Sequence, residues 1–373
     1  MYNMSVYSTL FNRSIEGVLK KTFKFSLKNP SFAFFALRMI RWQRKATRRR
    51  FQWVKQGIHV PPLMMATINK RCNLTCKGCY AQALQRTSDG EMTIDQWQRI
   101  MNEARELGMS IVMLLGGEPF VRQDILKVTK CFPEMIFLVF TNGLLLNREI
   151  MNALKRQKNV VPMISMEGFE KDTDKRRGKG VHGKIQRTMK GIKAGGTLFG
   201  ASLTVTRDNF TVVTSDHYIQ DLIDTGCKLI FFEEYIPVAQ GSENFALAGM
   251  QREKLESIKN ALSEKFNALF LIFPGSERKY GGCLAAGRGL IHINFDGNLE
   301  PCPLIPYSDT NVINVSLKEA LKSQFLMTIR NNGKTLNDNS AVCPLRGQQE
   351  WINSYFANNK MNQKMKSSGS AFL

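Results

Sequence analysis

The stretch Lys70-Arg71-Cys72-Asn73-Leu74-Thr75-Cys76-Lys77-Gly78-Cys79-Tyr80 holds three cysteines in the spacing C-x3-C-x2-C. The apolar run from Leu63 to Ile68 precedes it and predicts a β-strand, so the cysteines lie on the loop that leaves this strand. Three thiolates on one short loop can hold three irons of a cubic iron–sulfur cluster and leave the fourth iron open. Because most electron-transfer clusters are closed by four cysteines, an open iron indicates chemistry on a bound substrate or cofactor.

Zinc is the alternative metal for these thiols. A structural zinc site usually has four ligands, commonly as two C-x2-C pairs. The histidines of the chain are not grouped around the cysteine loop in sequence: His59, His182, His217 and His292. The ligand count therefore favours an iron–sulfur cluster at Cys72, Cys76 and Cys79 over a zinc site or three buried thiols.

A second motif follows one β–α unit later. The run Ile111 to Leu115 predicts a strand, and it ends in Gly116-Gly117-Glu118-Pro119. Glycines there let the backbone approach a ligand closely because no Cβ intervenes, although an ordinary strand-to-helix turn uses the same residues. Together with the cysteine spacing, this sequence resembles the radical S-adenosylmethionine (radical SAM) enzymes, whose GGEP motif meets the methionine amino group of SAM.

The resemblance implies a 4Fe–4S cluster on Cys72, Cys76 and Cys79, whose open iron binds the amino and carboxylate groups of SAM. It implies that an electron from this cluster cleaves SAM to a 5′-deoxyadenosyl radical, which abstracts hydrogen from a substrate. It also implies that Gly116, Gly117 and Glu118 contact SAM, and that an electron donor such as flavodoxin or ferredoxin is a partner. In such an enzyme the cofactors supply the hard chemistry and the protein aims the radical.

Strands and helices alternate beyond the second motif. We expect strands at 136–141, 161–166, 199–206 and 229–235, the last of the series, and helices near 93–107, 122–131, 147–157, 183–195 and 215–225. This alternation predicts right-handed β–α crossovers and an α/β fold with a parallel sheet. Six units are too few for an eight-stranded barrel. The resemblance implies a partial (β/α)6 TIM-like barrel with active residues at the carboxyl ends of its strands.

Three polar residues at predicted strand ends are candidates for lining the SAM or substrate pocket. Asn142 lies in Thr141-Asn142-Gly143, which matches the family's frequent T-N-G. Ser165 and Glu167 lie in a segment that resembles the S-x-D-G element, with Glu in place of the usual Asp. Arg177-Gly178-Lys179-Gly180 resembles the R-G-x-G element. Turn and helix-cap chemistry is the alternative for each polar residue.

Three further cysteines, Cys283, Cys302 and Cys343, follow the predicted barrel. Asp296-Gly297 lies between the first two and predicts a hairpin, which would bring these cysteines to neighbouring strands. The region resembles the auxiliary-cluster extension called SPASM, or its shorter twitch relative, but it has three of the seven SPASM cysteines. We expect the trio to hold a second, auxiliary 4Fe–4S cluster, with a zinc-stapled small domain as the alternative.

The N-terminal segment is strongly basic. Residues 1–56 carry thirteen Lys or Arg and one acid, Glu16, so this segment supplies +12 of the net charge of +21. We expect Pro30 to break the segment and Ser31 to cap a second helix. A basic amphipathic helix with Phe and Trp favours an anionic membrane surface as partner, and two helices docked on the barrel are an equal alternative. Nucleic-acid binding through Arg44–Arg50 is the least favoured. No apolar run reaches the roughly 18–20 residues of a membrane-spanning helix.

Length and composition predict one large and one small domain, since the 373 residues are 43% hydrophobic. We expect a basic helical extension at 1–60, a radical SAM core at 61–278, an auxiliary-cluster domain at 279–350 and a C-terminal tail at 351–373. The tail is polar, and we expect it to be frayed from residue 357.

Cysteine usage predicts a reducing compartment. The chain has eight cysteines, three of them on the predicted cluster loop, and this usage favours a cytoplasmic protein. Peripheral attachment of the protein to the inner face of the membrane stays open. Cys131 and Cys227 are expected to be plain buried thiols.

The sequence does not decide the class of substrate. Peptide maturation is the commonest task of SPASM-type relatives, whereas a lipid or isoprenoid suits the basic, aromatic N-terminus. The alternative to an enzyme is a non-enzymatic RNA- or membrane-binding protein that is stapled by zinc or by an iron–sulfur cluster.

Overall fold

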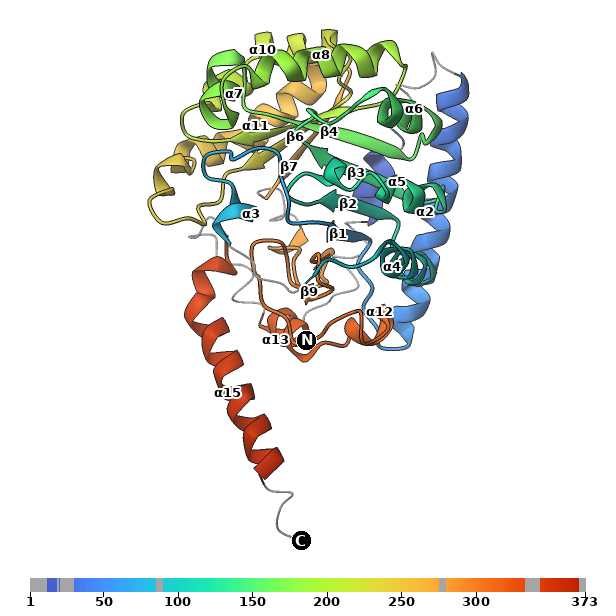
Figure 1. The fold of residues 1–373 in the computed structure, drawn as a ribbon, viewed down its shortest axis with the longest axis vertical. Helices are drawn as coiled ribbons and strands as arrows, with labels where there is room; N and C mark the ends of the chain where they lie inside the picture. Colours follow the sequence, from blue (N-terminus) through green and yellow to red (C-terminus); the bar gives the residue numbers. More distant parts are fainter. Residues whose placement is uncertain are drawn as a thin grey trace.

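The computed structural model describes residues 12–18, 20, 30–84, 90–274, 280–332 and 343–368. Within them the chain forms the α/β fold that the sequence predicts, with a partial barrel built on a mainly parallel sheet (Figure 1). Among these residues the sheet has nine strands in the order β7-β6-β5-β4-β3-β2-β1-β8-β9. Leu10, Leu19 and Thr22, which together with Ile15 and Val18 recur at helical spacing in the basic N-terminal segment and predict a helix there, lie outside the described part of the chain.

The strand bounds agree with the sequence over the first six units. The strands are β1 Leu63–Thr67, β2 Ile111–Leu115, β3 Ile136–Thr141, β4 Val160–Met166, β5 Gly200–Val205, β6 Leu229–Glu234, β7 Leu269–Phe273, β8 Leu290–Ile293 and β9 Leu299–Glu300. The expectation that the strand at 229–235 ends the series is wrong. β7 pairs in parallel with β6, and β8 pairs in parallel with β1 on the other side of the sheet.

The helices between β1 and β7 connect the strands, and most of them cover the outer face of the sheet (Figure 1). Their bounds are α2 Pro30–Lys55, α3 Tyr80–Ala83, α4 Ile94–Leu107, α5 Ile125–Lys130, α6 Arg148–Arg156, α7 Glu170–Arg177, α8 Val181–Ala194, α9 Phe210–Val213, α10 Asp216–Asp224, α11 Gly249–Lys265, α12 Leu317–Ala320, α13 Gln324–Asn331 and α15 Gln349–Ser368. The two ends of helix α4 are fixed by capping residues. Thr93 and Gln96 form a capping box at its start, and Gly108 ends it with φ +94°, a conformation that favours glycine.

The two faces of the sheet are packed differently. Along β3, residues alternate between half-buried and buried, as the period of two in a strand requires. Phe137 and Val139 are fully buried, whereas Ile136, Leu138 and Phe140 of the other face are half-buried. This second face lines the inside of the barrel, and two cavities occupy that interior. The barrel therefore has a hollow centre that can hold ligands.

Helix α2 lies along the barrel at the starts of the strands, on the side away from α3 (Figure 1). Ala36, Met39 and Ile40 are buried, and buried Arg50 donates a hydrogen bond to the backbone oxygen of Gly108 at the end of α4. These contacts support docking on the barrel. The helix begins at Pro30, so Ser31 lies inside it and is not its cap; proline is tolerated there because the first-turn N–H has no helical partner. None of the described helices is long and apolar enough to cross a membrane.

The expectation of a frayed tail from residue 357 is wrong for residues 357–368, because α15 continues through them. The start of α15 packs on the small C-terminal part of the fold. Ile352 is fully buried, and the ring of Phe325 on α13 lies 4.9 Å from that of Phe356 and 6.4 Å from that of Trp351. Figure 1 shows the rest of α15 extending away from the body of the molecule.

Candidate functional site

A cavity of about 660 Å³ opens at the carboxyl ends of the strands. Residues at the ends of six strands line it: Thr67, Leu115, Asn142, Ser165, Thr204 and Glu234. The three cysteines of the first loop and the three of the C-terminal region also line it: Cys72, Cys76, Cys79, Cys283, Cys302 and Cys343. The fold thus brings both predicted cysteine sets, more than 200 residues apart in sequence, to one cavity.

Backbone hydrogen bonds tie the cysteine loop to the Gly-Gly-Glu-Pro turn. The Gly117 N–H donates to the Asn69 carbonyl oxygen at 3.0 Å, and the Glu118 N–H donates to that of Arg71 at 2.8 Å. A Cβ on Gly117 would lie 2.2 Å from the Arg71 carbonyl oxygen, which is far inside any real contact. In the described structure Gly117 thus permits the close approach of the cysteine loop, and its contact with SAM stays a prediction.

A second contact holds the cysteine loop from the other side. The Lys77 N–H donates to the carbonyl oxygen of Arg176 near the end of α7 at 2.9 Å. Gly78, with φ +66°, adopts a left-handed turn directly before Cys79, the residue that precedes α3. The loop is thereby fixed between the second and fourth strand ends with its thiols facing the cavity.

Glu118 is buried and organises the next strand end. Its carboxylate accepts hydrogen bonds from the Phe120 N–H at 3.0 Å, the Thr141 hydroxyl at 2.7 Å and the Asn142 N–H at 2.7 Å. Burial raises the pKa of this carboxyl above its ordinary value, although these donors oppose the shift. Asn142 in turn donates through Nδ2 to the Asn73 side-chain oxygen at 2.8 Å, and the same Nδ2 lies 3.9 Å from the Cys72 sulfur.

Glu167 does not line the cavity. Its buried carboxylate accepts hydrogen bonds from Arg177 Nε at 2.6 Å and from Arg176 Nη1 at 2.6 Å. Burial alone would raise the pKa of Glu167, but the two guanidinium groups outweigh it and lower that pKa. Arg176 and Arg177 themselves line the cavity and lie close enough to Cys76 to favour its thiolate. Glu167 thus acts on the cavity by orienting the two arginines.

The sequence reasoning placed Arg177 in a motif but gave no role to Arg176 or Glu233. The usable signal was the adjacent pair of arginines directly before Gly178-Lys179-Gly180. Glu233 lines the cavity from β6 and accepts a hydrogen bond from the Ser202 hydroxyl at 2.7 Å, while burial raises the pKa of its carboxyl. The cavity wall therefore offers two guanidinium groups and a carboxyl beside the cysteine loop.

The two cysteine sets differ in exposure. Cys72 is exposed and Cys76 and Cys79 are half-buried, and burial still raises the pKa of the Cys72 and Cys76 thiols. Cys302 is buried, and burial raises its pKa strongly, with Cys343 and Cys283 near enough to add to the shift. Within the described residues, no three Cys, His, Asp or Glu side chains are arranged to hold one metal ion.

The hairpin at Asp296-Gly297 is confirmed, since β8 and β9 pair antiparallel across it and Gly297 has φ +87°. The two cysteines are not on these strands, however. Cys283 precedes β8 by several residues, and Cys302 follows β9 and forms an isolated bridge with Ile305. Cys283 and Cys302 line the same cavity, but they are not brought together by strand pairing.

Of the two remaining cysteines, which were both expected to be buried thiols, one is buried and the other is exposed. Cys227 is fully buried, its thiol donates to the Leu229 carbonyl oxygen at 3.0 Å, and its pKa is raised to about 12 by burial. Cys131 is exposed, so the expectation is wrong for it. It follows the last turn of α5, where the outer helix layer meets solvent.

The geometry is that of a partial parallel β/α barrel whose strand ends carry a cavity lined by cysteines. Comparison with known proteins gives the class of protein. Residues 67–207 match the Radical SAM superfamily. This range contains the cysteine loop, the Gly-Gly-Glu-Pro turn and the arginine pair. This match identifies residues 67–207 as a radical SAM region and the protein as a radical SAM enzyme, a class whose cofactors are a 4Fe–4S cluster and SAM.

The curated proteins that are similar to this chain are named for unlike reactions. It is 22% identical over 317 residues to the AdoMet-dependent heme synthase of Methanosarcina barkeri, covering 76% of this chain and 89% of that one. It is 23% identical over 261 residues to the sporulation killing factor maturation protein SkfB of Bacillus subtilis, covering 66% and 61%.

Solved structures share its fold. Streptococcus suis SuiB bound to S-adenosylmethionine aligns with a TM-score of 0.64 at 17% identity, over 79% of this chain and 73% of SuiB. The protein anSMEcpe with bound AdoMet aligns with a TM-score of 0.59 at 17% identity, over 74% and 81%.

Proposed function

We propose that Cys72, Cys76 and Cys79 hold the SAM-binding 4Fe–4S cluster, and that Gly116, Gly117, Glu118, Asn142 and Ser165 form the SAM side of the cavity. The bound cluster and SAM supply a 5′-deoxyadenosyl radical that takes a hydrogen atom from the substrate. The observation that carries the proposal is the cysteine loop, which is fixed by Gly117, Glu118 and Arg176 so that three sulfur donors face one cavity.

The donor set fits such a cluster. All three donors are thiols from one short loop, and soft thiolate ligands suit iron–sulfur clusters. The guanidinium groups of Arg176 and Arg177 lie near Cys76 and favour its thiolate form, which is the ligating form. Their orientation is held by Glu167. In this proposal Glu167 serves the cofactor site through the arginines.

Cys283, Cys302 and Cys343 are proposed to hold an auxiliary 4Fe–4S cluster. They line the same cavity as the first cysteine set, and the pKa of Cys302 responds to both of the other thiols. We propose the corresponding domain boundaries at 61–278 for the core and 279–350 for the auxiliary region. β8, at 290–293, nevertheless pairs directly with β1, so the two parts share one sheet.

The substrate is a peptide or a lipid in this proposal. The relatives named for heme synthesis and for maturation of a killing factor point to unlike substrates and do not choose between these classes. An electron donor such as flavodoxin or ferredoxin would reduce the cluster.

A matched pair of cysteine variants tests the cluster assignment. Cys76→Ala leaves two thiolates in the first loop, so anaerobically reconstituted protein should lose iron and the dithionite-dependent formation of 5′-deoxyadenosine from SAM. Cys131→Ala removes an exposed thiol from the outer helix layer and should change neither quantity. Full 5′-deoxyadenosine formation by Cys76→Ala would defeat the assignment.

A further inference from the structure

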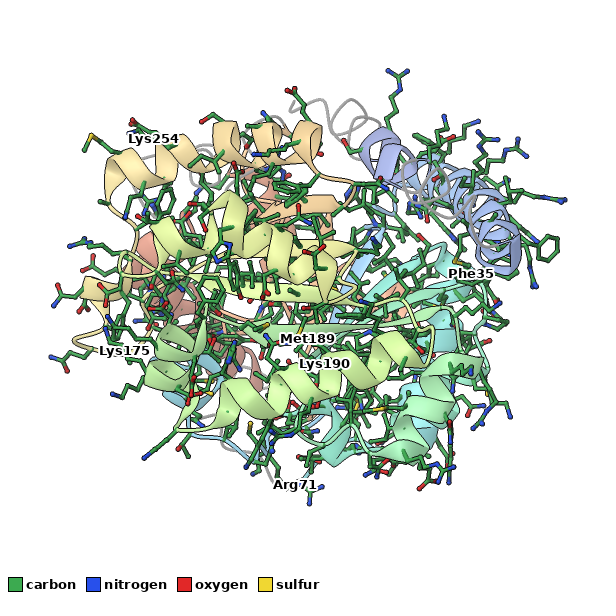
Figure 2. The ribbon with its side chains drawn as sticks, turned by 90° about the horizontal axis from the view of Figure 1, so that it is seen from above. Phe35, Arg71, Lys175, Met189, Lys190 and Lys254 are labelled. Atoms are coloured by element: carbon green, nitrogen blue, oxygen red, sulfur yellow. The ribbon has the colours of Figure 1, made fainter. Side chains whose placement is uncertain are left out.

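A second cavity, of about 270 Å³, lies inside the barrel at the end opposite the cysteines. Residues near the starts of the strands line it, among them Leu63, Ile111 and Leu229, and Ile15, Phe35 and Met39 of the N-terminal helices close it. In Figure 2, the labelled Phe35 and Arg71 mark the α2 side and the cysteine-loop side of the molecule. We call this second cavity the apolar chamber.

The apolar chamber adjoins the cysteine cavity. Met113, Phe231 and Phe273 face the barrel interior and line both cavities, and so do Leu284 and Leu290. In a closed eight-stranded barrel, layers of side chains fill this interior. Here the apolar side chains that line both cavities form their common boundary, so a molecule that occupies the chamber lies next to the place where the substrate radical would form.

The lining selects for hydrocarbon. Water in a cavity needs two to four polar partners, and a bound peptide would bring N–H and C=O groups that also need partners. Among the described lining residues, the side chains with polar atoms are few: Ser14, Lys158, Asn159, Lys259 and Tyr280. The other lining side chains are apolar, and some of them, such as Leu138 and Leu271, are half-buried. An alkyl chain would regain the dispersion contacts that these walls lack.

Charge adds a second requirement. Lys158 and Lys259 both line the chamber, and Lys259 Nζ also lies 3.4 Å from Glu256 Oε1. The exposed face of α2 beside the chamber carries Arg41 and Arg44, of which Arg44 pairs with Glu16 at 2.7 Å. The same face presents Phe34, with 64% of its surface exposed, and Leu37, with 46% exposed. Cations interleaved with exposed apolar side chains suit the surface of an anionic lipid assembly.

We propose that the apolar chamber binds the hydrocarbon chain of a lipid substrate with an anionic head group, with Lys158 and Lys259 serving the head group. The inference rests on the proposed function and names its substrate class. It places the chain along the barrel axis, so that its far end meets the cysteine cavity at the boundary lined by Met113, Phe231 and Phe273.

Palmitate is the probe for this proposal, measured by equilibrium dialysis against the anaerobically reconstituted, full-length enzyme. Wild-type protein should bind it saturably at one site, and competing fatty acids from C8 to C14 should gain about fourfold in affinity per added methylene. Methyl palmitate should compete at least tenfold less well, because it lacks the charge that the lysines recognise. Equal competition by all chain lengths would overturn the chamber as the site, and equal competition by the ester would overturn the role of the lysines.

Bulky substitutions locate the binding. Leu138→Trp and Leu271→Trp fill the chamber from two strands and should each lower palmitate affinity at least tenfold, whereas Met250→Trp at the exposed start of α11 is the control and should not. Thermal unfolding shows which of the two chamber variants are folded. If neither variant folds, the fatty-acid competition series with the wild-type protein still tests the proposal. Unchanged affinity in the folded chamber variants would overturn the proposal.

A separate assay of SAM cleavage by the wild type keeps the two proposals apart. Cleavage without palmitate binding would overturn the lipid inference alone. Binding without cleavage would contradict the proposed function alone.

Discussion

Gly117→Ala tests how the cysteine loop is held. The new Cβ would lie 2.2 Å from the carbonyl oxygen and 2.4 Å from the carbonyl carbon of Arg71, and 2.8 Å from the carbonyl oxygen of Lys70. All three atoms are backbone, so no side-chain rotation relieves the clash. The loop that carries Cys72 must therefore move away from the turn.

The loss of stability has two sources. The movement of the loop breaks the hydrogen bonds from the Gly117 and Glu118 N–H groups, each contributing about 1 kcal/mol. Overpacking against rigid neighbours adds about 1–3 kcal/mol. With an unfolding entropy of roughly 0.8 kcal/mol/K for 373 residues, the loss of about 3–5 kcal/mol lowers Tm by about 4–6 °C.

The assay combines thermal unfolding with iron content and 5′-deoxyadenosine formation after anaerobic reconstitution. Gly117→Ala should lose most of its bound iron at the first cysteine set and most SAM cleavage. Gly183→Ala on α8 is the matched control, since its Cβ meets only the end of the Arg187 side chain at 3.9 Å, and it should retain both. Wild-type iron content, cleavage and Tm in Gly117→Ala would refute the reasoning.

Three further predictions concern single residues. Glu118→Gln places an amide N–H₂ against the Asn142 N–H, so urea unfolding should show a loss of about 1.5–3 kcal/mol, and an unchanged midpoint would contradict the buried hydrogen bonds. Cys302→Ala should lower the iron and sulfide content while SAM cleavage without substrate continues; wild-type iron content would remove the auxiliary cluster. Phe325→Ala should cost about 3–5 kcal/mol and open the packed start of α15, around Ile352, to limited proteolysis, whereas protease resistance of this start equal to wild type would show that its docking does not depend on this ring.

Much of the barrel could be predicted from the sequence because its strands are continuous apolar runs, as in sheets that are buried on both faces. The runs at 111–115 and 136–141 gave the bounds of β2 and β3 without error. The three-cysteine loop was found for a different reason, since its function requires particular residue types at a fixed spacing. Both signals are local in the chain.

Long-range features escaped the sequence reasoning. β7 is an apolar run like the others, but it follows α11, and nothing local shows that it continues the sheet beside β6. The parallel pairing of β8 with β1 joins segments more than 200 residues apart. The apolar chamber is also a product of this assembly, because it depends on which face of each strand turns inward and on where α2 docks.

The role of Gly117 shows the same limit in a single residue. Its sequence motif indicates a close backbone approach, and the structure adds the backbone of Arg71 as a partner that the motif does not show. Glu167 is similar, since the strand-end position was found from a motif while its ion pairs with Arg176 and Arg177 depend on the fold of α7. Tertiary contacts decide what each motif residue touches.

The most direct test of the central claim is a count of iron and sulfide in anaerobically reconstituted protein, followed by reduction with dithionite, addition of SAM and assay of 5′-deoxyadenosine. Two cubic clusters predict about eight irons per chain together with SAM cleavage. About four irons with cleavage would leave the C-terminal cysteines without a cluster. Zinc at the cysteines with no 5′-deoxyadenosine would contradict the account.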